Sequence, residues 1–177
     1  MGLIFMLRDL LIAIGDTIFG RTRRRYEHAV LIQAPRELVW RMLRARDIVF
    51  DGLMPLHVHA ESLPGRPNLE AVHISAGDTQ LTMLTRIADE RPGLAILYEI
   101  LPDGTEPALI EGIDDYIGFV LADVDEGTRL DLMRETTPAR WISRITVPLG
   151  LRSGARRYKR KAEAMAKAED GLEASNG

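Results

Sequence analysis

The stretch Val30–Trp40, VLIQAPRELVW, decides the architecture at the start of the chain. Its first half is apolar and rich in β-branched residues, so we predict a strand over Glu27–Gln33. Ala34 precedes Pro35, and the residue before a proline is held in extended geometry, which ends the strand. Proline suits the first turn of a helix, where its missing N–H costs nothing. We therefore expect a helix over Arg36–Arg46.

Downstream of this strand and helix, short β-branched runs alternate with glycine and proline turns. Turns roughly every 8–12 residues are typical of antiparallel strands that follow one another in the sheet. The predicted strands cover residues 56–62, 69–75, 80–88, 94–101, 116–124 and 128–135. The stretch 108–115 fits either a strand extension or a bulged edge.

The period becomes helical after Pro138. Pro148 and Gly150 lie inside this segment, so we expect a kink or a break there. The opposite face is basic, which fits a solvated surface, a contact with an anionic membrane, or nucleic-acid binding. The apolar stripe contains Trp141, Ile142, Ile145, Leu149, Ala155, Ala162, Met165 and Ala166.

This order of elements predicts an α+β fold, in which a curled antiparallel sheet of six to seven strands wraps around a long C-terminal helix. An antiparallel sheet with one buried face needs a cover, and the long helix is the only large element left to provide it. A curled sheet that grips a helix leaves a gap suited to a ligand. The expected organisation is an N-terminal amphipathic helix and basic linker over 1–26, the domain over 27–168, and a frayed polar tail over 169–177.

Three stretches carry a resemblance to a known family. Val30–Trp40 resembles the opening strand and helix of the START-like, helix-grip (SRPBCC) superfamily, Ala88–Leu94 resembles its mid-sheet turn, and Asp125–Leu130 resembles its Gly-Thr-Arg turn. The resemblance covers about residues 27–168 and points to members similar to polyketide cyclase/dehydrase or coenzyme-Q-binding proteins. It implies the fold and a ligand pocket, but no catalytic motif is shared across the superfamily.

Strand alternation predicts which side chains line that pocket. An apolar lining favours a hydrophobic ligand, and Tyr98 or Arg134 would orient it. The alternative is that these side chains fill a solid core. The expected ligand-binding residues are Met83, Ile96, Tyr98, Leu132, Arg134, Trp141 and Ile145.

Composition excludes several classes of protein. The 177 residues are 46% hydrophobic and include no cysteine, which excludes disulfide scaffolds, thiolate metal sites and cysteine nucleophiles. The formal net charge is −3, with basic ends around an acidic middle, so the whole protein is not expected to bind nucleic acid. GxSxG, GxGxxG and Walker patterns are absent, and we predict neither a catalytic residue nor a cofactor.

A metal site is also not expected. His57 and His59 share a strand face and His73 is predicted on the next strand, but apolar residues alternate with them and should face inward. The acidic residues of 114–126 lack a calcium-loop pattern and fit a solvated turn. We therefore predict solvent-facing histidines and no metal.

The first twenty residues have the pattern of an imperfect amphipathic helix, followed by an arginine cluster. Three interpretations are open: the helix packs on its own domain, on a second copy or on a partner protein; it lies in a membrane interface; or it spans a membrane. The interpretation as a helix in a membrane interface predicts a protein of the cytoplasm, peripheral to the inner membrane. The expected membrane contacts are Leu7, Leu11, Ile14, Ile18, Arg21, Arg23, Arg24 and Arg25.

We therefore expect a protein that binds or transports a hydrophobic small molecule, such as a lipid or quinone, at the membrane surface. The alternatives are a polyketide cyclase or aromatase, and a membrane-associated assembly subunit that uses its N-terminal helix. An enzyme would need an acid–base pair inside the gap.

Overall fold

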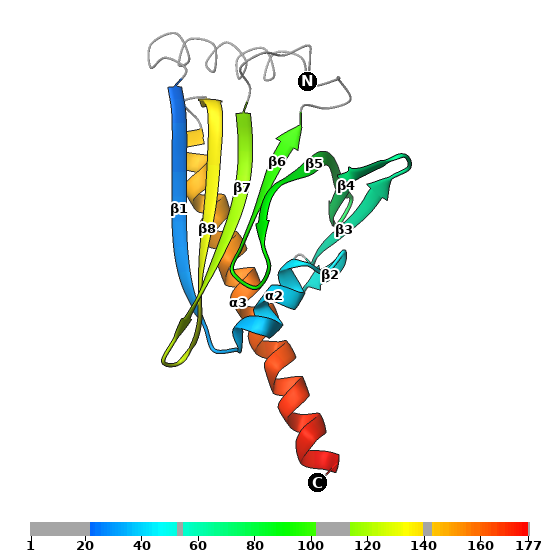
Figure 1. Cartoon of the computed structure of the whole chain (residues 1–177), viewed down its shortest axis with the longest axis vertical. Coiled ribbons are helices and arrows are strands. Elements are labelled where there is room, and N and C mark those ends of the chain that lie inside the picture. The colour runs from blue at the N-terminus through cyan, green and yellow to red at the C-terminus, as the bar shows by residue number, and fades with distance from the viewer. Residues whose placement is uncertain (1–21, 53–54, 102–113, 140–142, 177) are drawn as a thin grey trace.

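A computed structural model of the chain describes residues 22–52, 55–101, 114–139 and 143–176. In this part of the chain, eight antiparallel strands form one curled sheet beside a long helix (Figure 1). The strand order is β1-β8-β7-β6-β5-β4-β3-β2. The bounds are β1 Thr22–Ile32, α2 Arg36–Leu43, β2 Asp47–Phe50, β3 Leu56–Leu63, β4 Arg66–Ala76, β5 Thr79–Arg91, β6 Ala95–Leu101, β7 Asp114–Val124, β8 Gly127–Ala139 and α3 Ser143–Asn176.

The predicted class and sheet are confirmed, but the predicted strand count was too low. The additional strand is β2, whose four residues pair with β3 from Asp47 opposite His59 to Phe50 opposite Leu56. It begins soon after α2 with no glycine or proline to separate them, so no turn signal marks it in the sequence. Its alternate residues Ile48 and Phe50 are buried, which is the pattern of a strand covered on one face.

The opening stretch and the predicted Gly-Thr turn meet in the structure. The buried Thr128 hydroxyl donates a hydrogen bond of 2.7 Å to the Ala34 carbonyl. Gly127 has φ +138°, and a Cβ there would lie 2.2 Å from the Ile32 carbonyl oxygen, so only glycine fits. The Pro35 carbonyl accepts the first helical bonds, from the N–H groups of Leu38 and Val39. The end of β1 is thereby fastened to β8 and aimed into α2.

The helix α3 is continuous from Ser143 to Asn176 and contains Pro148. Of the kink or break expected near Pro148 and Gly150, the break is therefore absent, and the tail that we expected to fray at 169–177 is helical to Asn176. A glutamate explains part of this extension, because Glu169 accepts a 2.6 Å bond from Arg41 of α2. None of the helices described here is both long and apolar enough to cross a membrane.

The core lies where α3 and α2 pack against the β1, β8 and β7 part of the sheet. α3 contacts β1 most extensively, then β8 and α2. Ala155 and Ala162 of α3 are fully buried, and their small side chains let the helix approach the sheet closely. The sheet and α2 contribute the larger core side chains, which include Ile32, Val39, Met42, Leu121 and Leu130.

The N-terminal predictions fall mostly outside the described residues. This applies to Leu7, Leu11, Ile14, Ile18 and Arg21, and to the side chain of Arg23. β1 begins at Thr22, before the strand that we predicted from Glu27, so Arg24 and Arg25 are strand residues opposite Thr136 and Glu135 of β8. Arg25 also donates a 2.5 Å bond to Glu27.

Candidate ligand-binding site

A cavity of about 660 Å³ lies between α3 and the inner face of the sheet. The helix contributes one face of its first turns, and the strands from β2 to β8 contribute their inward side chains. Its wall consists of Met42–Arg46, Ile48, Phe50, Leu56, Val58, Ala60, Glu70, Val72, Ile74, Met83, Thr85, Tyr98, Ile100, Ile117, Phe119, Leu132, Arg134, Thr146, Val147, Gly150, Leu151, Gly154, Arg157 and Tyr158.

The pairing of the strands explains why these residues converge. Val72 of β4 lies opposite Met83 of β5, and Thr85 lies opposite both Glu70 of β4 and Ile100 of β6. Residues that face one another across a sheet project from the same side, so these five side chains form a continuous inner surface. The wall is mostly aliphatic and aromatic, which is typical of a site for a small apolar molecule.

The structure places the sequence-predicted residues in three groups. Met83, Tyr98, Leu132 and Arg134 line the cavity. Ile96 and Ile145 do not: Ile96 is 2% exposed inside the packed core, and Ile145 is 58% exposed on the outside of α3. Trp141 lies outside the described residues.

Ile145 was predicted on the face of α3 that lines the cavity, but it lies on a different face of the helix. The apolar stripe predicted for α3 continued through Ile145 and Leu149, but both side chains are exposed. The helix presents Val147, Leu151 and Gly154 to the cavity instead. Apolar periodicity identifies a helix face only when the apolar residues are the buried ones.

Arg134 does not offer a free cation to the cavity. Its Nε donates a 2.9 Å hydrogen bond to Asp115 Oδ1, and its Nη2 binds the other carboxylate oxygen. Desolvation raises the pKa of Asp115 above its ordinary value, while Arg134 acts in the opposite direction. The pairing of Val124 with Gly127 at the β7–β8 turn places Asp115 diagonally across from Arg134. The turn at Asp125–Gly127 indicates this register in the sequence, so the ion pair was predictable from it.

The second cationic group in the wall is Arg44, at the end of α2. Its Nε lies 3.1 Å from Glu90 Oε1, and its Nη1 donates a long 3.4 Å bond to the Tyr98 hydroxyl. Burial raises the pKa of Tyr98, so its phenol keeps its proton at neutral pH. Tyr98 is therefore held by Arg44 as a neutral hydroxyl at the cavity wall.

Arg46, Glu70 and Thr85 are among the polar residues of the wall that were not predicted from the sequence. Arg46 Nη2 donates a 3.2 Å bond to Glu70 Oε1. Glu70 is in phase with Val72 and Ile74, and Thr85 is in phase with Met83, so strand alternation alone could have placed both on the inner face. Arg46 carries no comparable signal, because it lies in the link between α2 and β2.

Tyr158 is the largest α3 side chain at the cavity and was also missed. Its ring packs edge-on against Phe50 and Phe119, with centroid distances of 5.1 Å and 5.5 Å. Burial raises the pKa of its phenol strongly, with a further contribution from Tyr98. The aromatic cluster closes the cavity toward the packed core.

The histidines face the outside of the sheet, as predicted. His57 and His59 are exposed, and the His59 ring stacks on that of His73 with centroids 6.3 Å apart. His57 Nε2 lies 2.5 Å from Asp47 Oδ1, and His73 contacts Thr82 and Glu61. Among the described residues, no group of three or more histidine or carboxylate side chains is placed to hold a metal ion.

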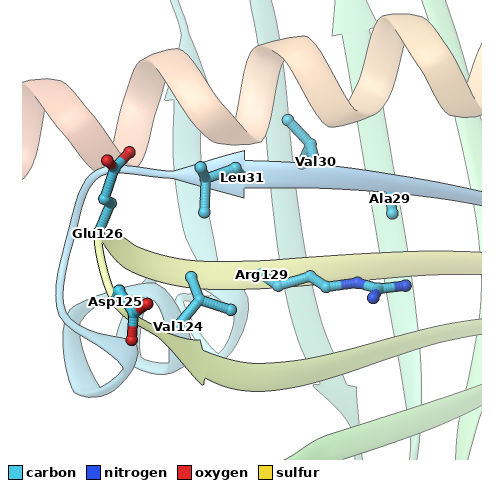
Figure 2. A pocket seen from close by; sticks show the side chains of 7 residues that line it. All are labelled: Ala29, Val30, Leu31, Val124, Asp125, Glu126 and Arg129. Carbon is cyan, nitrogen blue, oxygen red and sulfur yellow. The ribbon is translucent and has the colours of Figure 1, made fainter.

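A second hollow of about 400 Å³ lies at the outer surface, around the β7–β8 turn. Figure 2 shows that β1, the end of β7, the β7–β8 turn and β8 supply its side chains, with Asp125 and Glu126 at one end. Its central cation, Arg129, is already paired with Asp131 at 2.9 Å. We therefore regard the larger inner cavity as the candidate site.

Comparisons with known proteins give a likeness of structure. No family model and no curated protein matches the sequence. Protein NE0264 from Nitrosomonas europaea is 15% identical, with a TM-score of 0.60 over 83% of this chain and 96% of that one. Protein CV1439 from Chromobacterium violaceum is 17% identical, with a TM-score of 0.56 over 80% of this chain and 96% of that one.

A third similar structure is described as the di-domain aromatase/cyclase StfQ of the steffimycin biosynthetic pathway. It is 14% identical with a TM-score of 0.57, and the match covers 84% of this chain and 52% of that two-domain chain. Likeness at this level of identity shows the fold and leaves activity open. The chain thus has the fold of these structures, the helix-grip arrangement of a curled antiparallel sheet around a long C-terminal helix that was expected from its sequence.

Proposed function

We propose that this protein binds a hydrophobic small molecule in the cavity between α3 and the sheet. The observation that carries the proposal is the 660 Å³ of space walled by aliphatic and aromatic side chains. A solid core would have closed this space, because protein interiors pack to the density of organic crystals. A cavity of this size suits a drug-sized ligand.

Native mass spectrometry of the purified full-length protein tests this proposal. We expect a bound species that is lost on denaturation, and saturable binding of the neutral dye Nile red. In Gly154→Leu, which places a side chain inside the cavity, both signals should fall at least about tenfold. Gly171→Leu, at the far end of α3, is the matched control because a Cβ there meets nothing within 4 Å. A folded protein that binds neither species would refute the proposal.

We further propose that the ligand is taken up at an anionic membrane surface. Arg152, Arg156, Arg160 and Lys167 recur along one exposed stripe of α3, and none has an ion-pair partner among the described residues. Ile145 and Leu149 continue this stripe as exposed aliphatic side chains. Cations over anionic headgroups, with aliphatic side chains at the acyl boundary, are typical of peripheral helices.

Cosedimentation with vesicles tests the membrane proposal. Binding to phosphatidylglycerol vesicles should exceed binding to phosphatidylcholine vesicles and should weaken with salt. The double variant Arg156→Glu and Arg160→Glu should lose most of it, whereas Arg91→Glu on β5 should not. Deleting residues 2–20 separates the N-terminal contribution and leaves β1 complete. Equal binding to both vesicles would contradict the proposal.

A second candidate function is a cyclase or aromatase. It is favoured by the contact of Tyr98 with Arg44 and by the carboxylate of Glu70 in the same wall, which together could serve as proton donor and acceptor. Turnover of a polyketide substrate that survives both Tyr98→Phe and Glu70→Gln would remove this candidate.

The remaining candidate is an assembly subunit that uses residues 1–20 to bind a partner or a second copy. These residues lie outside the described part of the chain. Loss of a complex in the 2–20 deletion, with vesicle binding retained, would favour this role over membrane contact.

A further inference from the structure

One polar group in the cavity wall has no partner within the described part of the chain. Thr85 is 5% exposed, and its Oγ1 is buried without a hydrogen bond. A buried hydroxyl without a partner is costly, and native proteins leave few of them. Because Thr85 lines the cavity, an occupant of the cavity is placed to supply the missing bond.

The neighbours of Thr85 restrict which group can supply that bond. Glu70 lies directly opposite on β4, is 8% exposed and lines the same cavity. On the other side is the aliphatic Ile100 of β6. An occupant that accepts a bond from Thr85 therefore comes close to a carboxylate, which can only accept bonds while it is ionised.

The arginines of the wall do not offset that carboxylate in favour of an anionic ligand. Arg44 faces Glu90 at 3.1 Å, Arg46 faces Glu70 at 3.2 Å, and Arg134 is bound by Asp115. The fourth, Arg157, also has an interaction partner. Since each arginine is engaged, a carboxylate or phosphate buried beside Glu70 would be desolvated without a free cation to stabilise it.

We propose that Thr85 and Glu70 form a subsite for the hydroxyl group of a neutral alcohol or phenol on an apolar skeleton. The hydroxyl accepts a bond from Thr85 Oγ1 and donates its own proton to the Glu70 carboxylate, so both donors are satisfied. The apolar skeleton lies along Val72, Met83 and Ile100. This inference rests on the proposed function and names its ligand class.

Three naphthalene probes test the subsite at neutral pH, where 2-naphthol is uncharged. Binding of naphthalene, 2-naphthol and 2-naphthoate to the full-length protein is measured by fluorescence titration. We expect 2-naphthol to bind about tenfold more tightly than naphthalene, which is the effect of one hydrogen-bonded charged partner, and 2-naphthoate to bind most weakly.

The matched variants are Thr85→Val, which has nearly the same shape, and Thr79→Val, an exposed position on the same strand. Thr85→Val should weaken 2-naphthol binding several-fold, toward the affinity of naphthalene, while the bond to Glu70 remains, and should leave naphthalene binding unchanged. Thr79→Val should change neither probe. Circular dichroism and thermal unfolding establish that both variants fold.

The outcomes distinguish the subsite from the cavity. Equal affinity for 2-naphthol and naphthalene, tightest binding of 2-naphthoate, or a Thr85→Val variant with unchanged affinity for 2-naphthol would each overturn the subsite while leaving the proposed function intact. If no probe binds the folded protein, the proposed function fails and the subsite fails with it.

Discussion

The two halves of the sheet differ in how closely they pack against α3. β1 and β8 run along α3 and pack against it, whereas β3 and β4 diverge from it at the other side of the molecule (Figure 1). In the packed half, the helix presents alanines that are fully buried. On the cavity side of α3, Gly150 and Gly154 supply no side chain to fill the space in front of strands β2 to β8. Small residues thus let α3 approach β1 and β8 closely at one place and leave room for the cavity at another.

The largest expected effect is on the free energy of unfolding when one leucine is replaced by alanine in each half of the sheet. Leu130→Ala in the packed half should lower the free energy of unfolding by about 2–5 kcal/mol, because a fully buried leucine leaves a void in a close-packed core. Leu56→Ala at the cavity should cost less than about 2 kcal/mol, since its side chain already borders open space. Urea unfolding measures both, and equal costs would show that the two halves are packed alike.

A substitution that fills the cavity tests the same difference in packing between the two halves. A Cβ at Gly154 would lie 3.9 Å from Leu132 Cδ2, so a side chain there has room to enter. Gly154→Leu should preserve or raise stability while weakening Nile red binding at least about tenfold, or roughly 1.4 kcal/mol. Dye titration and thermal unfolding of the same sample check this. A strongly destabilised variant would mean that the space is not available to a side chain.

A smaller gain is expected from Gly150→Ala. A Cβ at this position meets nothing within 4 Å, and glycine inside a helix costs roughly 0.5–1 kcal/mol relative to alanine. The thermal midpoint should therefore rise. A fall would indicate that the helix at the cavity needs the conformational freedom of glycine.

The smallest effect concerns the ion pair at the edge of the cavity, because Arg134 offsets much of the desolvation of Asp115. The pKa of Asp115 is still raised, so the folded protein holds this proton at a pH where the unfolded chain has released it. The stabilisation that protonated Asp115 provides is complete below its ordinary pKa of 3.8. It is lost as the pH rises through the raised pKa of the folded protein.

Unfolding of wild-type and Asp115→Asn across acidic pH tests this sign. The wild-type protein should lose stability relative to the variant as the pH rises. Asp125→Asn, in the exposed β7–β8 turn, controls for the change in net charge. A relative gain with rising pH would show that Arg134 outweighs desolvation.

The fold was largely predictable, because local chemistry marks its elements. Proline after alanine ended β1 and started α2, and glycine turns separated the long strands. β2 was missed because it is only four residues long and no glycine or proline separates it from α2. Four of the cavity residues were also predictable, since strand alternation places Met83, Tyr98, Leu132 and Arg134 on the inner face.

Amino-acid order alone determined the sequence of strands and helices, since turn residues and apolar periodicity act within a few positions. Only the tertiary structure decided that Arg44 holds Tyr98 and that Ile145 faces outward. It also left the Thr85 hydroxyl buried without a partner in the described chain. These outcomes depend on how tightly the sheet curls around α3, which is a property of the whole packing and not of any local stretch.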